Sequence, residues 1–372
     1  MRNYDPATDT WTLTAPHPVA AGWRWATTLA NGMILVVGGA KDLFSAVASS
    51  HLYDPKTNTW IATRPLPIGT VNPHALMRPI LLPTGQILIA GGIDQDGIND
   101  LLSGAPVPTP SRNAYLFTLN WRNPSLSSWD YTRQSDGRVS LMPEGRTSSA
   151  LVLMTNGNVL NVGGLGPSAE DTEAATNTTS LFNPRSGLWT SAAPMPPVYG
   201  LAEDESISVY PTAPGSRWGP FAQSMDNGKV LVAGGTAGLL IEWVLRSSAL
   251  IYDPHRDTWR ITTPMHYRRS PGAWLAKLPG EAGFLFAGPG VPPSSLFLVH
   301  DLTGEIFHPE SEDWTFAPTP NGPPTDNSVD SFDSTSVQLV DGRLQVAGGP
   351  DYVTDSIATN QSWIFTPAEA PH

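Results

Sequence analysis

The sequence contains no cysteine, and this excludes disulfide bonds, thiolate nucleophiles and metal sites with cysteine ligands. Basic residues are scarce: 21 Lys and Arg stand against 33 Asp and Glu, for a formal net charge of −12 at pH 7. Because binding to a phosphate backbone depends on an excess of Lys and Arg, we expect no nucleic-acid partner.

Long apolar segments are also missing. No apolar run approaches the length that spans a bilayer, so we expect no membrane span. No signal peptide follows Met1, which predicts a cytoplasmic protein as the sequence is written and a secreted one if its beginning has been trimmed. No Ser-His-Asp order, phosphate-binding loop or His-Glu-x-x-His pattern occurs, and we expect no cofactor.

Glycine and proline, by contrast, are abundant, with 34 and 37 residues in a chain of 372. This composition is typical of many short strands joined by tight turns. With 40% hydrophobic residues the chain can also bury a large core, which argues against disorder.

A short apolar run followed by a glycine pair recurs along the chain. Five copies read MILVVGG, QILIAGG, NVLNVGG, KVLVAGG and RLQVAGG, and GFLFAGPG is a sixth in which Pro289 interrupts the pair. A turn signal, usually a polar residue and Gly, precedes each run, which is typical of a β-hairpin. Because the runs do not alternate with polar residues, they predict strands that are covered on both faces.

A second motif recurs out of phase with the first. An aromatic residue, a Pro-containing turn and a tryptophan appear in YDPATDTW, YDPKTNTW, FNPRSGLW, YDPHRDTW and FHPESEDW, with a stretched copy that ends at Trp129. Proline fixes φ and Asp or Asn caps the bend, so the aromatic residue and the tryptophan are expected on adjacent antiparallel strands.

The first glycines of the six pairs lie 53, 72, 71, 54 and 60 residues apart, and each unit has room for four strands. Units of this length with four strands are typical of propeller blades. The combined motifs resemble the kelch repeat family over essentially the whole chain. The resemblance implies an all-β, six-bladed propeller of four-stranded blades in one domain, residues 1–372, whose last blade is closed by the N-terminal strand. The expected blades are 21–67, 74–136, 146–196, 217–264, 269–320, and 331–367 with 1–15.

The antiparallel strand order predicts where a site lies. The long insertions 93–112, 165–178 and 190–220 all fall on one face, and long loops in a compact domain are commonly functional. We therefore expect the site on this face, at the centre of the propeller.

One aligned position, about eleven residues before each hairpin turn, is rich in cationic residues. It holds His74, Arg146, Arg217 and Arg269. The other predicted ligand contacts near this ring are Trp23, Arg24, Trp218 and Tyr352. Guanidinium groups form bidentate pairs with carboxylate or phosphate groups, and aromatic rings can stack on sugars. In the alternative interpretation the arginines bridge neighbouring blades through backbone carbonyls and acidic loops.

Metal sites are weaker hypotheses. His17 and His266 occupy equivalent loops and could join His74 in a three-histidine site. The acidic residues Asp326, Asp330 and Asp333 could hold Ca²⁺ or simply form an acidic rim that faces the arginines. We therefore expect no metal ion in the site.

The favoured function is a monomeric binding propeller for an anionic ligand: a sugar acid, a carboxylated small molecule or an acidic peptide. The resemblance implies this, because many kelch propellers capture acidic peptides with arginines. The copper site of galactose oxidase, a kelch relative, needs a Tyr–Cys crosslink and is excluded here. A bacterial sialic acid mutarotase is among the six-bladed kelch proteins that the chain resembles.

Two other functions stay open. One is a non-redox enzyme, an isomerase, mutarotase or lyase, in which the three arginines orient a carboxylated or carbohydrate substrate. His74, Glu205 or Asp333 would then move a proton. The other is a carbohydrate-adhesion or scaffold domain of a longer secreted protein.

Overall fold

The computed structural model describes most of the chain. The described residues are 2–5, 8, 10–21, 24–39, 47–67, 70–71, 79–94, 110–167, 173–198, 215–237, 244–269, 274–278, 283–287, 290–291, 304–317, 335–338, 344–347 and 362–365.

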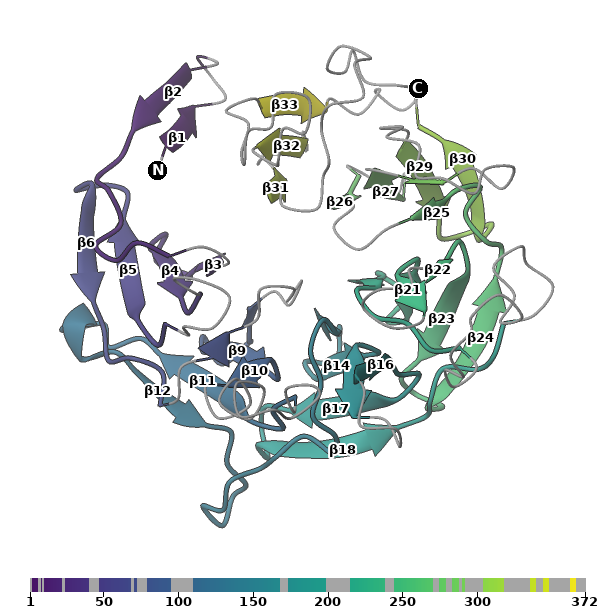
Figure 1. Ribbon diagram of the computed structural model, residues 1–372, viewed down its shortest axis with the longest axis horizontal. Helices are drawn as coiled ribbons and strands as arrows, with labels where there is room; N and C mark the ends of the chain where they lie inside the picture. The colour runs from purple at the N-terminus through teal and green to yellow at the C-terminus, as the bar shows by residue number, and fades with distance from the viewer. Residues whose placement is uncertain are drawn as a thin grey trace.

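Five antiparallel sheets of four strands make up most of the described chain (Figure 1). Sheet 1 contains β3 (Trp25–Thr28), β4 (Ile34–Val37), β5 (Ser50–Asp54) and β6 (Thr59–Ala62). Sheet 2 contains β8 (Ile80–Leu81), β9 (Ile87–Ala90), β11 (Ala114–Thr118) and β12 (Ser128–Tyr131). Sheet 3 contains β13 (Ala150–Leu153), β14 (Val159–Val162), β17 (Thr179–Asn183) and β18 (Leu188–Ala192). Sheet 4 contains β19 (Phe221–Ser224), β20 (Val230–Ala233), β23 (Ala249–Asp253) and β24 (Thr258–Thr262). Sheet 5 contains β26 (Trp274–Lys277), β27 (Phe284–Ala287), β29 (Gly304–His308) and β30 (Asp313–Phe316).

Two further sheets lie at the ends of the chain. The N-terminal hairpin pairs β1 (Arg2–Asp5) with β2 (Thr10–Leu13). The C-terminal sheet has three strands, β31 (Thr335–Gln338), β32 (Leu344–Ala347) and β33 (Ser362–Phe365). Within the described residues, no strand pairing joins the N-terminal hairpin to the C-terminal sheet.

Four small two-stranded sheets accompany the larger ones. They pair β7 (Thr70–Val71) with β10 (Ile93–Asp94), β15 (Leu165–Pro167) with β16 (Glu173–Ala175), β21 (Thr236–Ala237) with β22 (Val244–Leu245), and β25 (Arg268–Arg269) with β28 (Gly290–Val291). A single 3₁₀ turn, η1 (Pro124–Leu126), is the only helical element among the described residues. The all-β class and the four-stranded antiparallel units that the sequence predicts are thus confirmed.

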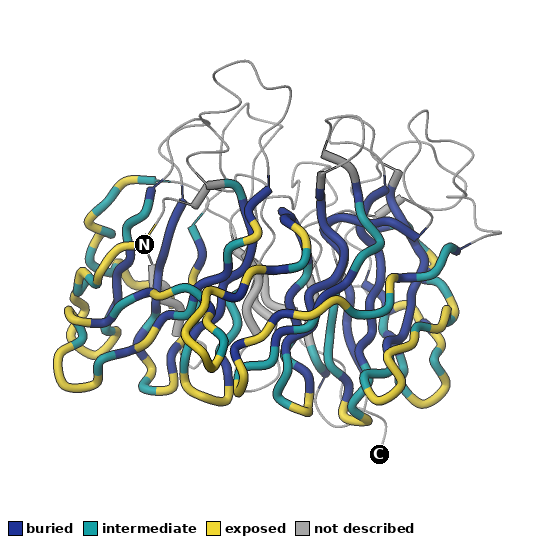
Figure 2. Tube along the Cα trace, turned by 90° about the horizontal axis from the view of Figure 1, so that it is seen from below, coloured by how far each residue is buried: buried dark blue, intermediate teal, exposed yellow. Residues whose placement is uncertain are grey.

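The sheets follow one another in chain order around a ring, with the fourth strand of each sheet at the outside (Figure 1). Each sheet runs first to fourth strand without crossing connections. In sheets 1, 3 and 4, short turns join the first strand to the second and the third to the fourth, and we call this side of the molecule the turn face. In sheet 2 the longer connection 119–127, which includes η1, joins the third strand to the fourth. The glycine pairs and the small two-stranded sheets lie at the opposite side, the loop face. Exposed turns gather along one side of the molecule and buried strands fill its middle (Figure 2).

The second strands are covered on both faces, as their unbroken apolar pattern predicts. All four residues are buried in β9, β14 and β20. The apolar clusters they join lie between neighbouring sheets, because sheet 3 contributes Val152 and Leu160 to the same cluster as Val230 and Tyr252 of sheet 4. Burying such a side chain stabilises the fold by about 1.5–3 kcal/mol, so the contacts between sheets hold the ring together.

The recurring tryptophan serves two contacts at once. Its ring packs on the aromatic residue across the third and fourth strands, with centroids 4.9 Å apart for Tyr252 and Trp259. Its indole N–H reaches the preceding sheet: Trp259 donates to Ala193 O at 2.7 Å, and Trp314 to Thr263 O at 2.8 Å. The predicted cross-strand placement is confirmed, and the tryptophans of sheets 2, 4 and 5 also tie their sheets to the one before, whereas the indole N–H of Trp189 in sheet 3 has no partner among the described residues.

Candidate functional site

Glycine pairs bring successive sheets together at the loop face. Gly91 and Gly163 have φ values of 76° and 61°, and a Cβ at either position would clash with the main-chain oxygen of Arg146 or Arg217. The next glycine of each pair donates its N–H to the same oxygen, from Gly92 to Arg146 O at 3.0 Å and from Gly164 to Arg217 O at 2.9 Å. Glycine is therefore required both for its backbone conformation and for the close approach of the next sheet.

Arg146 lies four residues before the first strand of sheet 3 and is 1% exposed. Its Nη1 donates to Gly163 O at 3.2 Å and Thr178 O at 3.0 Å, and its Nη2 donates to Thr178 Oγ1 at 2.9 Å. Glu144 Oε2 lies 3.6 Å from Nη2. Burial lowers the pKa of Arg146 to about 10, and the charge of Glu144 opposes this shift.

Arg217 repeats this arrangement one sheet further along the ring. The side chain is fully buried, and its Nη1 donates to Gly234 O and Ser248 O, both at 3.2 Å. Its Nη2 donates to Ser248 Oγ at 3.0 Å. Both guanidinium groups thus hold the corner between the second and third strands of their own sheet, while their main-chain oxygens hold the preceding sheet. We call this paired arrangement the Gly–Arg corner. It favours the structural alternative for these two side chains, and their contact with a ligand stays a prediction.

Arg269 has a different partner. Its Nη2 lies 2.8 Å from Glu305 Oε1, and both side chains are fully buried. Glu305 accepts three more hydrogen bonds, from Tyr267 N at 3.1 Å and from His266 N and Nδ1 at 2.6 and 2.9 Å. The strand register places Glu305 level with Leu250 of sheet 4, where no charge occurs.

Sequence reasoning missed Glu305, because a single acid in an otherwise ordinary third strand carries no motif. The signal that could have found it is its difference from the aligned positions of the other repeats.

The imidazole of His266 is oriented by Glu305. Every other donor to this carboxylate is an N–H group, so the carboxylate is an acceptor and His266 Nδ1 carries the proton in the bond between them. The Nε2 atom is then the basic nitrogen. The His266 side chain is 46% exposed and its ring lies 4.5 Å from that of Phe316, which is 52% exposed. Tyr267 contacts the same Phe316 ring at 5.8 Å.

A protein-family model described as the Kelch motif matches residues 224–266. The chain carries a kelch motif. The matched segment runs from the end of β19 through β24 and includes Gly234, Gly235 and Trp259, so it supports a place in the kelch-repeat family. A search of curated proteins found no match, and a resemblance to sialic acid mutarotases is not shown. Kelch-type propellers are common protein-binding scaffolds.

Trp218 directly precedes this kelch motif's sheet and is buried. It packs with Leu165 and Ala175 of the small sheet above sheet 3, and its main chain pairs with Thr236 in both directions, at 2.8 and 2.9 Å. Arg24 is partly buried and turns back on its own loop. It donates to Val19 O at 2.8 Å and Ala21 O at 3.3 Å, and burial lowers its pKa.

The remaining predicted site residues lie outside the described part of the chain. They are Trp23, His74, Glu205, Asp333 and Tyr352, together with Asp326 and Asp330 of the calcium hypothesis. The described residues contain no group of three His, Asp or Glu arranged to hold a metal ion. Nor does any helix among them have the length and apolar character needed to cross a membrane.

Two buried groups near the loop face were not singled out from the sequence. Arg246 is 1% exposed and donates Nε–H to Ser216 O at 3.0 Å. His51, in sheet 1, is buried with its ring 4.7 Å from that of His17. Burial is the main cause that lowers the pKa of both histidines, and the charge of Arg24 adds to it.

Proposed function

We propose that residues 1–372 form one six-bladed kelch propeller, whose sixth position is shared by the N-terminal hairpin and the C-terminal sheet. Contacts of sheet 1 support this arrangement. Trp60 donates its indole N–H to Ala15 O at 3.0 Å, and Ala15 follows β2 as Ala193 follows β18. Asn58 Oδ1 also accepts from Ala15 N at 2.7 Å. The N-terminal hairpin therefore meets sheet 1 as sheet 3 meets sheet 4. On the other side β31 packs beside β26 of sheet 5.

We further propose that the chain is a binding propeller whose loop face receives a ligand of negative charge. One observation carries this proposal. Four arginines beneath that face are almost fully buried, whereas Glu305 is the single buried carboxylate among the described residues. The four are Arg146, Arg217, Arg246 and Arg269. Charges in a low-dielectric interior are weakly screened, so they can attract an anion to one face of a chain whose net charge is −12.

Buried and loop residues have different roles in binding of this kind. The guanidinium groups of Arg146 and Arg217 fix the corners and supply charge at a distance. Direct contacts would come from the loops above, where Trp23 and Tyr352 are predicted. A peptide or a carboxylated small molecule are both compatible with a scaffold of this kind.

Two labelled peptides of equal length test the charge preference, one built from Glu and Gly and the other from Lys and Gly. We expect fluorescence anisotropy to detect binding of the acidic peptide only, and we expect added salt to weaken it. Equal binding of both peptides, or none of either, would contradict the proposal.

A non-redox enzyme is the second candidate, and the His266–Glu305 pair favours it. A carboxylate that holds Nδ1–H orients the imidazole and leaves Nε2 as a general base. An NMR assay of anomer exchange in carboxylated sugars would compare the unmodified chain with His266→Asn. We expect the variant to fold normally, because the ring is half exposed, and to lose the acceleration. An equal rate in both proteins would remove His266 from the mechanism.

A further inference from the structure

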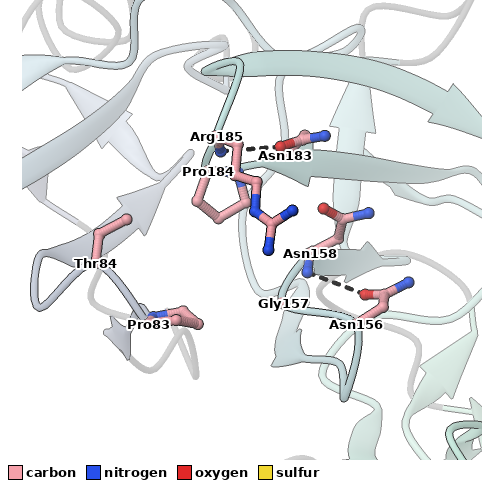
Figure 3. Close-up of a pocket in the computed structure, with 8 residues that line it drawn as sticks. All are labelled: Pro83, Thr84, Asn156, Gly157, Asn158, Asn183, Pro184 and Arg185. Atoms are coloured by element: carbon pink, nitrogen blue, oxygen red, sulfur yellow. Dashed lines mark hydrogen bonds between the residues drawn. The ribbon is translucent and has the colours of Figure 1, made fainter.

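A pocket opens on the turn face between sheets 2 and 3, well apart from the loop face. Its volume is about 430 Å³. The lining residues come from three turns: Pro83 and Thr84 in sheet 2, Asn156, Gly157 and Asn158 in sheet 3, and Asn183, Pro184 and Arg185 in sheet 3. Figure 3 shows the guanidinium group of Arg185 between the turn of sheet 2 and the turns of sheet 3.

Hydrogen-bond donors dominate this lining. Asn183 Oδ1 accepts from Arg185 N at 2.9 Å, and Asn156 Oδ1 accepts from Asn158 N at 3.0 Å. Because their oxygens are engaged in the turns, both amides offer their Nδ2 groups instead. Arg185 forms no ion pair with any described residue, and none of the lining residues is acidic.

The same place between sheets 4 and 5 provides an internal comparison. A pocket of about 260 Å³ lies there, and Glu310 takes the position that Arg185 has in sheet 3. Its one lysine, Lys277, is bound to Asp226 at 2.7 and 2.8 Å. A hollow therefore occurs at two equivalent junctions, but an acid-free lining and an arginine without an ion pair among the described residues distinguish the pocket between sheets 2 and 3.

The turn of sheet 4 shows what Asn183 does. Asp253 occupies the equivalent position, and its Oδ2 lies 2.8 Å from Nη1 of Arg256. An uncharged Asn183 cannot neutralise Arg185 in this way. Because sheet 3 has Asn183 where sheet 4 has Asp253, the charge of Arg185 is available to a ligand.

We propose that this pocket binds a hydroxylated carboxylate of monosaccharide size, such as a uronic acid. The guanidinium fork matches a carboxylate. The amides of Asn156, Asn158 and Asn183 can exchange hydrogen bonds with hydroxyl groups, and Pro83 and Pro184 supply apolar wall. The volume lies within the range of small-molecule sites.

Titration of the full chain with glucuronate, glucose and inorganic phosphate, followed by ligand-observed NMR, tests the proposal. Glucuronate is expected to bind more tightly than either of the others. Arg185→Gln should weaken glucuronate binding about tenfold or more, because a charge-assisted pair is lost. Asn183→Asp should also weaken it, since the new carboxylate competes for Arg185.

Arg256→Gln is the matched control, because it removes an exposed arginine from the equivalent turn of sheet 4, and it should leave binding unchanged. Glucuronate binding that is absent, or equal in Arg185→Gln and Arg256→Gln, would overturn the site. If phosphate binds as tightly as glucuronate, the preference for a hydroxylated carboxylate is wrong. If glucose binds as tightly as glucuronate, the ligand's charge has no role in binding. Acidic peptide binding at the loop face should be the same in Arg185→Gln, so the two proposals can fail separately.

Discussion

The repeats differ from one another in single residues, and the hydrogen-bond partners of the buried arginines show this most clearly. Arg146 and Arg217 follow one pattern, with acceptors on backbone and hydroxyl oxygens, and Arg269 follows another, with Glu305. Sequence alignment of the repeats located all three arginines. It could not tell which way a guanidinium group turns, because the acceptors belong to a strand corner that is distant in sequence.

Replacement of Glu305 by Gln should destabilise the fold by about 3–5 kcal/mol. The change removes the negative partner of a fully buried Arg269, and breaking a buried pair leaves an uncompensated charge. Urea unfolding measures the effect. Glu310→Gln, an exposed acid of the same sheet, is the control and should stay within about 0.5 kcal/mol of the unmodified chain. Similar stabilities for both variants would show that the buried pair contributes little.

The paired rings of His17 and His51 predict a loss of stability in mild acid. Burial lowers both pKa values in the folded state, so the unfolded chain binds protons more readily. The stability that the neutral rings contribute is complete above a pH of about 6.5 and falls as the pH drops toward the lowered values. Denaturant unfolding between pH 7.5 and 5 should show the decline, and His51→Gln should make it smaller. The exposed His255→Gln should leave it unchanged; an unaltered slope in His51→Gln would contradict the explanation.

Elements of the sheets were largely predictable from the sequence. The apolar runs became buried second strands, and the aromatic–tryptophan motif became the third and fourth strands, because both patterns are local and repeated. The small sheets such as β15–β16 were not predicted. The strands β15 and β16 lie in the insertion 165–178, are only three residues long, and depend on pairing with chain beyond the glycine pair.

Gly163→Ala should be far more damaging than Gly32→Ala. Both glycines have positive φ, at 61° and 83°, so both substitutions carry a strain of about 1–2 kcal/mol. A Cβ at Gly163 also collides with Arg217 O, whereas a Cβ at Gly32 meets no neighbouring atom. We expect a loss beyond about 4 kcal/mol for Gly163→Ala, measured by thermal unfolding. Equal losses would mean that the corner between sheets can widen freely.

At the scale of the whole molecule, the sequence predicted six units and a last blade that the N-terminal strand completes, and this closure of the ring stays a prediction. The segments that would close it stand at opposite ends of the chain. The hydrogen bonds of Ala15 with Trp60 and Asn58 connect the chain just after the N-terminal hairpin to sheet 1.

A circular permutant tests the closure. A short linker joins residues 372 and 1, and new ends are opened in the exposed turn at Gly137. If the N-terminal hairpin and the C-terminal sheet share one blade, the permutant should fold and unfold in one transition near the original temperature. Deletion of residues 1–13 should lower that temperature, because sheet 1 loses its neighbour. A permutant that fails to fold while the deletion is harmless would contradict a closed ring.

The Gly–Arg corner has a direction: sheets 3 and 4 each offer a main-chain oxygen to the preceding sheet and fold the guanidinium group into their own strand corner. Each of these two junctions is therefore complete once two successive units are present. A gene duplication that copies one such unit would carry both halves of its docking chemistry with it. Tandem copying of such a unit would therefore add a sheet without requiring new contacts at the junction.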